Sequence, residues 1–143
     1  MTDRKLFGTN KLIEDFVQRL TKLHSLDGGW TTEYVDSETG QKWLKYVVDE
    51  RGFCENLILI SPKPTTDKLI DIAFLSPYPD EVSAAATRLN IEEQADKKEF
   101  REKLLNRLRQ LDISNLDTTG KDRIKTIIQA SQLTDGGNKR EIV

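Results

Sequence analysis

Cysteine and histidine are nearly absent from this sequence: Cys54 is the one cysteine and His24 the one histidine. A single cysteine excludes a disulfide within the chain and is typical of proteins kept in a reducing compartment. One cysteine and one histidine also cannot supply an ordinary zinc site of nitrogen and sulfur ligands. We therefore expect a cytoplasmic protein with no metal site and no cofactor.

Long apolar runs are missing as well. No stretch reaches the roughly 18 apolar residues that a membrane-spanning helix needs, and the first residues lack the apolar core of a signal peptide. The length of 143 residues, with 36% hydrophobic and 32% charged residues, is typical of one globular domain with a charged surface. We expect no association with membranes.

The common catalytic motifs are also absent, namely a Gly-rich phosphate loop, Gly-x-Ser-x-Gly and His-Glu-x-x-His. A nucleophile pair of Cys54 and His24 is conceivable, but Cys54 begins an apolar run and is expected to be a buried, inert thiol. His24 is expected to have a structural role at the end of the first helix, where a cation is favoured. The sequence therefore predicts a protein that is not an enzyme.

Acidic residues at turns leave one catalytic alternative open. Two carboxylates can share general acid and base work when burial separates their pKa values. Three acidic pairs lie at expected turns or at a helix start, where water keeps carboxylates ionised: Asp36 with Glu38, Asp49 with Glu50, and Asp80 with Glu81. A small hydrolase that uses these carboxylates is the less favoured alternative.

The stretch 28–61 predicts the sheet. It holds both tryptophans and the longest apolar run, and Asp/Gly turns at 36–40 and 49–52 divide it. Aromatic and β-branched residues between such turns are typical of hairpins, so we expect antiparallel strands at 30–36, 41–49 and 53–61. The third strand is apolar on both faces and should be covered on both sides.

Helical patterns flank the strands. Apolar residues at steps of three and four predict helices, with a break at 61–64, where prolines interrupt the chain. The segment 67–75 fits either a helix, which we favour, or a fourth strand. The expected helices are 10–26, 67–75, 80–89, 91–111 and 121–132, followed by a tail at 134–143.

The predicted fold class is therefore α+β: a meander of three or four antiparallel strands covered by the helices 10–26 and 91–111. We expect one domain over 1–143, with a helix and meander in 1–62 and a helical layer in 63–133.

Negative charge gathers in the middle of the chain. Residues 30–81 hold ten acidic and five basic residues, whereas the whole chain has a net charge of −2. Such a surface disfavours nucleic acid and anionic lipid and favours a basic partner. The alternative is that these residues are ordinary solvated turn residues.

The first hairpin carries a family resemblance. Its pattern, Trp-x3-Tyr-x-Asp-x2-Thr-Gly-x2-Trp, is made by Gly29-Trp30, Tyr34, Asp36, Thr39-Gly40 and Trp43. This pattern resembles that of small bacterial immunity proteins, which bind and neutralise polymorphic or contact-dependent toxins. Over residues 29–43, the resemblance implies a non-catalytic cytoplasmic protein that binds a toxin.

We therefore predict a module that binds a protein partner, with a basic toxin domain as the favoured partner. Acidic side chains would steer association and exposed aromatic side chains would anchor it. Tyr78, between two prolines, should be exposed, whereas strand alternation leaves open which tryptophan is exposed. The predicted partner-binding residues are Asp36, Glu38, Trp43, Asp49, Glu50, Tyr78, Asp80 and Glu81. A structural adaptor of a larger assembly is the alternative, and the sequence leaves the oligomeric state open.

Overall fold

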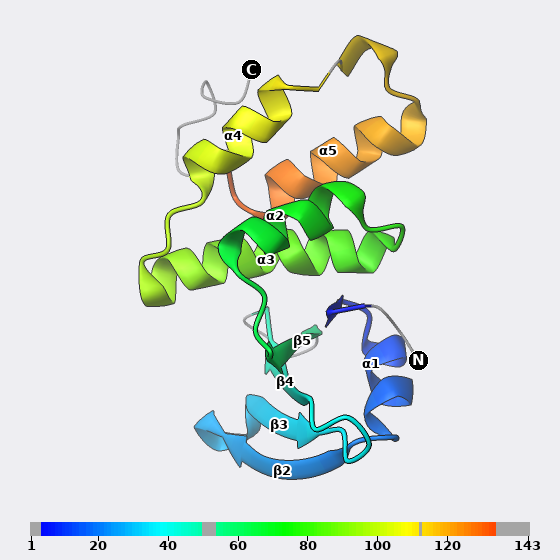
Figure 1. Ribbon diagram of the computed structural model, residues 1–143, viewed down its shortest axis with the longest axis vertical. Helices are drawn as coiled ribbons and strands as arrows, with labels where there is room; N and C mark the ends of the chain where they lie inside the picture. The colour runs from blue at the N-terminus through cyan, green and yellow to red at the C-terminus, as the bar shows by residue number, and fades with distance from the viewer. Residues whose placement is uncertain (1–3, 50–53, 112, 134–143) are drawn as a thin grey trace. The chain divides into compact units, whose positions relative to one another are not determined.

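The computed structural model describes residues 4–49, 54–111 and 113–133, and these have the α+β architecture that the sequence predicted (Figure 1). The chain divides into two compact units, residues 1–64 and 65–143. The strands that the structure describes all belong to the first unit, and the described part of the second unit is helical. The boundary lies at the proline-containing break expected at 61–64.

The first unit is built on a five-stranded antiparallel sheet with the strand order β1-β5-β4-β3-β2. The strands are β1 (Leu6–Phe7), β2 (Thr21–Leu26), β3 (Thr31–Val35), β4 (Lys42–Val47) and β5 (Glu55–Ser61). The three strands predicted from the sequence are β3, β4 and β5. The prediction of three or four strands was too low, because the short β1 pairs with β5 and β2 pairs with β3.

The helix predicted over 10–26 is only half correct. Helix α1 (Asn10–Val17) is shorter, and the chain then forms β2 (Thr21–Leu26). Leu20, Leu23 and Leu26 recur every three residues, which imitates a helical stripe. In the structure, the register on β3 shifts between Lys22 and His24. This bulge breaks the alternation that would have marked a strand.

One face of the sheet is covered by α1. Ile13, the buried residue of this helix, packs in a core whose members come from α1, β1, β3, β4 and β5. The rings of Phe7 and Phe16 stack with centroids 4.7 Å apart, and Phe16 meets Trp43 edge to face at 4.8 Å. Residues 56–59 of β5 are all buried, so this strand is buried on both faces, as its double apolar pattern predicted.

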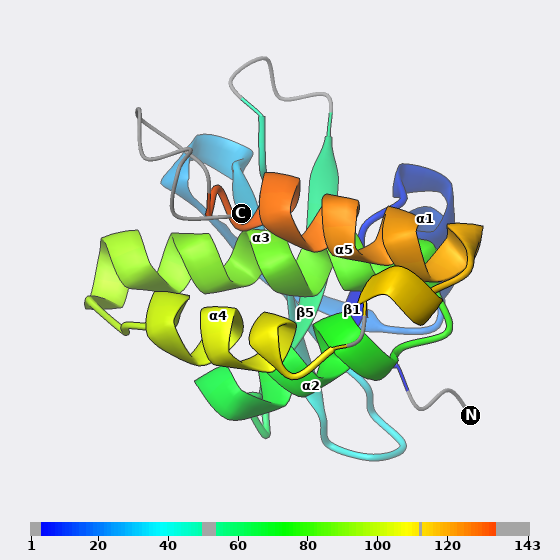
Figure 2. The ribbon, with the colours of Figure 1, turned by 90° about the horizontal axis from the view of Figure 1, so that it is seen from above.

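The second unit is a set of four α-helices: α2 (Thr66–Leu75), α3 (Pro79–Asp96), α4 (Arg101–Arg109) and α5 (Thr118–Ala130). Helix α3 packs against both α2 and α5 (Figure 2). The ambiguous segment 67–75 is helical, and the Thr65 side chain caps it by accepting a hydrogen bond from the Lys68 N–H at 3.1 Å. None of the helices in the described ranges is long and apolar enough to span a membrane.

The single helix predicted over 91–111 is wrong. Its first residues continue α3, and the chain then breaks at Lys97, whose φ of 57° lies in the left-handed region. A left-handed residue ends a helix, and it is usually glycine or asparagine. The break lets Phe100, which is almost fully buried, begin the separate helix α4. No glycine or proline marks this break in the sequence.

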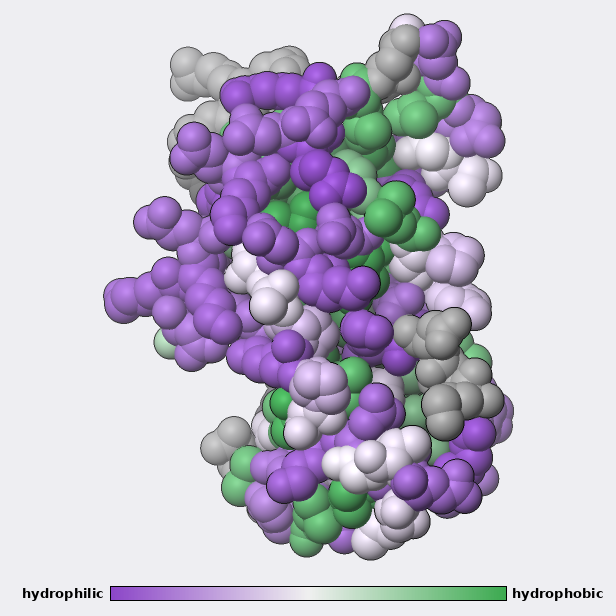
Figure 3. Space-filling view, viewed as in Figure 1, coloured by the Kyte–Doolittle hydropathy of each residue, from purple (hydrophilic) through white to green (hydrophobic). Residues whose placement is uncertain are grey.

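Ion pairs connect α4 to α2. Lys103 meets Asp67 at 3.0 Å, and Arg107 meets Asp71 at 2.7 Å. The visible surface over α4 is correspondingly hydrophilic (Figure 3). Asp67 and Asp71, two of the ten acidic residues in 30–81, are therefore paired with basic residues within the second unit.

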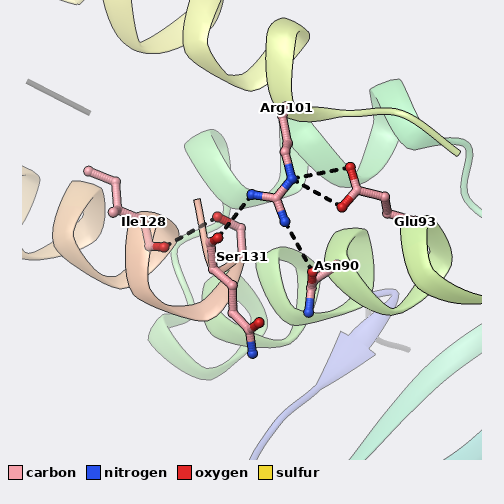
Figure 4. A network of polar contacts seen from close by, with 6 residues as sticks. Asn90, Glu93, Arg101, Ile128 and Ser131 are labelled. Carbon is pink, nitrogen blue, oxygen red and sulfur yellow. Dashed lines mark hydrogen bonds and ion pairs between the residues drawn. The ribbon is translucent and has the colours of Figure 1, made fainter. Parts of the chain in front are cut away.

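Arg101 joins α4 to two other elements (Figure 4). Its Nε donates to both carboxylate oxygens of Glu93 on α3, at 3.0 and 3.2 Å. Nη1 donates to the backbone carbonyl of Gln132 at 2.9 Å, just beyond α5, and Nη2 to Oδ1 of Asn90 at 3.4 Å. A planar guanidinium can hold such a set of acceptors, whereas an ammonium group cannot reproduce its fixed fork.

Ile13→Ala should destabilise the first unit by about 2–5 kcal/mol, because the change removes buried apolar atoms and leaves a cavity. Leu12→Ala is the matched control: Leu12 is its neighbour on α1 but is exposed, so the effect should stay within about 0.5 kcal/mol. Both tryptophans lie in the first unit, so urea unfolding followed by tryptophan fluorescence reports on this unit. Equal effects of the two substitutions would contradict the packing of α1.

Candidate functional site

The loop between α2 and α3 exposes apolar side chains. Leu75 is 71% and Tyr78 44% exposed, and Pro77 and Pro79 beside them are exposed as well. The exposure of Tyr78 is as predicted from its position between two prolines. Aromatic side chains in such positions are frequent anchors of protein interfaces.

Internal hydrogen bonds hold this loop in place. The hydroxyl of the buried Ser76 donates to Oε1 of Glu81 at 2.6 Å and accepts the backbone N–H of Tyr78 at 3.1 Å. Pro79 occupies the first turn of α3, where its fixed φ suits the helix. The Val82 N–H donates to the Tyr78 carbonyl at 3.1 Å and closes that turn. Tyr78 is therefore presented by a loop that is fixed on both sides.

The two acidic residues after this loop begin a helix, as the sequence predicted, but the burial of Glu81 was not expected. Both Asp80 and Glu81 lie in the first turn of α3, near the positive end of the helix dipole. Asp80 is half-buried. Glu81, expected as a solvated carboxylate at the surface, is buried and bonded to Ser76. Its side chain therefore supports the loop.

A cavity of about 270 Å³ lies beside the loop, between the start of α3 and α5. It is lined by Pro77, Pro79, Val82, Thr119, Asp122, Arg123 and Thr126. The guanidinium of Arg123 also donates to the carbonyl of Ala73 in α2 at 3.1 Å. The surface of the second unit thus offers an exposed aromatic ring next to a hollow, which is a shape that a protein partner can complement.

The first unit has its own candidate site at the turn between β3 and β4. Oδ1 of Asp36 accepts the Glu38 N–H at 2.9 Å, and the Gly40 N–H donates to the Asp36 carbonyl at 2.7 Å. Gly40 has a φ of 76°, a conformation that glycine adopts without strain. The Asp and Gly of the pattern at residues 29–43 therefore shape this turn.

A larger cavity, about 460 Å³, lies between this turn and α1. Its lining residues are Phe16, Arg19, Leu20, Asp36, Ser37, Glu38, Gln41 and Trp43. The structure thus brings together three of the predicted partner-binding residues, Asp36, Glu38 and Trp43. The other lining residues were not predicted, because 10–26 was expected to be one helix and nothing in the sequence placed Arg19 beside a turn more than ten residues away.

The two tryptophans differ in exposure. Trp43 is 2% exposed and lies in the core beneath the cavity, whereas Trp30, just before β3, is the exposed one. Trp43 was predicted as a partner-binding residue, with the identity of the exposed tryptophan left open, and its burial limits it to contact through the cavity.

The remaining predicted residues, Asp49 and Glu50, follow β4 in the sequence. Glu50 lies outside the described residues. The side chain of Asp49 accepts the Cys54 N–H at 2.8 Å.

The prediction of a buried thiol is wrong, because Cys54 precedes β5 and is exposed, whereas burial begins with Asn56. His24 lies on β2, which is three strands away from β5 with β4 and β3 between them, so about 14 Å separates the two strands and the Cys–His pair does not form.

His24 instead lies 3.3 Å from the carboxylate of Glu33 on the neighbouring strand β3. Its expected place at the end of a helix is therefore wrong. Across the described ranges, no group of three histidine, cysteine or acidic side chains is placed to hold a metal ion.

Comparisons of this chain with protein-family models, with curated proteins and with solved structures found no match. The function is therefore inferred from the two surfaces described above.

Ser76→Ala should cost the second unit about 1.5–3 kcal/mol, because it removes the hydrogen bond to a buried carboxylate. It should also speed hydrogen exchange at the Tyr78 amide, which loses its acceptor. The control is Ser83→Ala, on the half-buried part of the same helix α3, which should be near neutral. Unchanged stability and unchanged Tyr78 exchange in the Ser76 variant would show that the loop is held by other contacts.

Proposed function

We propose that this protein is a non-catalytic, cytoplasmic protein-binding module that acts as an immunity-type inhibitor of a bacterial toxin. One observation carries the proposal: Leu75 and Tyr78 are exposed on a loop fixed by the buried Ser76–Glu81 hydrogen bond. A loop backbone that is already ordered before association lowers the entropic cost of binding. The resemblance of residues 29–43 to immunity proteins supports the choice of partner.

The contacts of the turn carboxylates favour binding over hydrolysis. Asp36 and Asp49, which the hydrolase alternative would use, each accept a backbone N–H at their own turn. Glu81 accepts the hydroxyl of Ser76. Carboxylates that stabilise turns have their hydrogen-bonding capacity partly used, which supports a structural role for them.

The charge distribution favours a basic partner for the first unit. Glu33 and Glu55 lie beside His24 and Lys45, so the acidic side chains at the surface of the unit are partly paired. Asp36 and Glu38 instead line the open cavity at the β3–β4 turn. Charges at the rim of an interface mainly speed association, and their effect weakens as salt is added.

The adaptor alternative is favoured by one feature, the edge of the sheet. All six residues of β2 are exposed, including Leu23 and Leu26, and Trp30 is exposed nearby. An exposed edge strand can pair with a strand of another chain. Constitutive self-association or assembly through β2, measured by light scattering, would support this alternative.

Tyr78→Ala should raise the dissociation rate of the complex about 30-fold or more, as expected for the loss of a hot-spot residue worth about 2 kcal/mol. The partner for this test is the toxin domain that the proposal expects a neighbouring gene to encode, and surface plasmon resonance measures the rate. Leu23→Ala is the matched control, because Leu23 is 43% exposed and Tyr78 44%, but Leu23 lies in the other unit. It should leave the rate unchanged.

Growth gives a second readout of the same proposal. The toxin domain alone should arrest a bacterial host, and co-expression of this chain should restore growth. Loss of rescue with Tyr78→Ala but not with Leu23→Ala supports the proposal. A neighbouring gene that encodes no toxin, or a toxin that this chain neither binds nor neutralises, would overturn it in favour of the adaptor class.

A further inference from the structure

The cavity at the β3–β4 turn has two chemically different walls. One wall carries the carboxylates of Asp36 and Glu38, and the other carries the rings of Phe16 and Trp43. Its volume of about 460 Å³ is within the usual range for pockets that enclose a ligand group. Carboxylates and aromatic ring faces both attract a cation, since the ring faces are electron-rich.

Glu38 is the carboxylate best placed to bind a new partner. It is exposed, lines the cavity, and its carboxylate makes no hydrogen bond or ion pair with the residues that the structure describes. Asp36 next to it accepts the backbone N–H of Glu38, which orders the turn that carries both side chains. An ordered turn loses less conformational freedom when a cation binds.

A guanidinium already lies against the aromatic wall. Arg19 lines the cavity, and its guanidinium carbon is 5.2 Å from the centre of the Phe16 ring. This distance is within the range of a cation–π contact. The wall therefore accepts a planar cation within the protein itself, and Arg19 would compete with an arriving one.

A buried donor gives a separate indication of a ligand. The indole N–H of Trp43, which lines the cavity, is buried and has no hydrogen-bond acceptor among the described residues. Buried donors without an acceptor are rare in folded proteins. A ligand in this cavity could supply the missing acceptor through a backbone carbonyl.

Building on the proposed function, we propose that this cavity receives an arginine side chain of the protein partner. The guanidinium would lie between the carboxylates of Asp36 and Glu38 and the ring of Phe16, in the place that Arg19 now holds. Arginine fits better than lysine, because its planar fork can bond two carboxylates while its face stacks on a ring. The Trp43 indole would bind a carbonyl of the same peptide.

The probe for this proposal is N-acetyl-arginine amide, which carries both a guanidinium and peptide carbonyls. Its titration into the labelled protein, followed by NMR, should shift the Trp43 indole N–H and the amides of residues 37–41. The Trp30 indole N–H does not line the cavity and serves as the internal reference. The citrulline analogue, which is nearly the same size but neutral, should give no shift at the same concentration, and the lysine analogue a weaker one.

Two substitutions separate binding from a structural effect. Glu38→Gln should weaken probe binding about fivefold or more, whereas Glu14→Gln, an exposed carboxylate on α1 outside the cavity, should leave it unchanged. Arg19→Gln should tighten binding about two- to fivefold by removing the internal competitor. A purely structural role for Arg19 would not produce tighter binding.

The outcomes distinguish this proposal from the proposed function. If the toxin domain binds but the probe does not, or if citrulline binds as well as arginine, the arginine site is wrong and the binding module stands. Weaker probe binding by Arg19→Gln would also overturn the arginine site. If the probe binds as expected but no toxin partner is found, the arginine site is supported and the proposed immunity function is rejected.

Discussion

The hydrogen bond between Ser76 and the buried carboxylate of Glu81 is the contact on which the proposed binding surface depends. A carboxylate withdrawn from water must keep its donors, because leaving it unsatisfied costs several kilocalories per mole. This requirement fixes Ser76, and Ser76 in turn accepts the Tyr78 N–H. The backbone that carries the exposed ring of Tyr78 is thus held by polar groups that the solvent does not reach.

The first unit uses the same principle at a different turn. There the carboxylate of Asp36 and the backbone of Gly40 fix the β3–β4 turn, which leaves Glu38 exposed at the edge of the cavity. The rings of Phe7, Phe16 and Trp43, which pack on one another, hold α1 on the sheet and fix the aromatic part of the cavity lining. Each unit therefore presents an exposed group on a turn whose neighbours are internally bonded.

The sequence predicted those parts of the fold that local patterns determine, namely β3 to β5 and α2. It missed β2, because a bulge breaks the alternation of that strand, and it missed the break at Lys97, because no glycine marks it. The exposure of Tyr78 followed from its flanking prolines. The burial of Glu81 and the position of Arg19 could not be predicted, since both depend on contacts that only the folded chain creates.

Hydrogen–deuterium exchange with and without the toxin domain tests the central claim, that the loop fixed by Glu81 is the binding surface. The account predicts that the partner adds most protection at residues 75–82, with a second protected segment at 36–41. Mixing at low and high salt should change how fast this protection develops more than how long it lasts. Added protection confined to residues 21–26 of β2 would contradict the account and indicate assembly through the edge of the sheet.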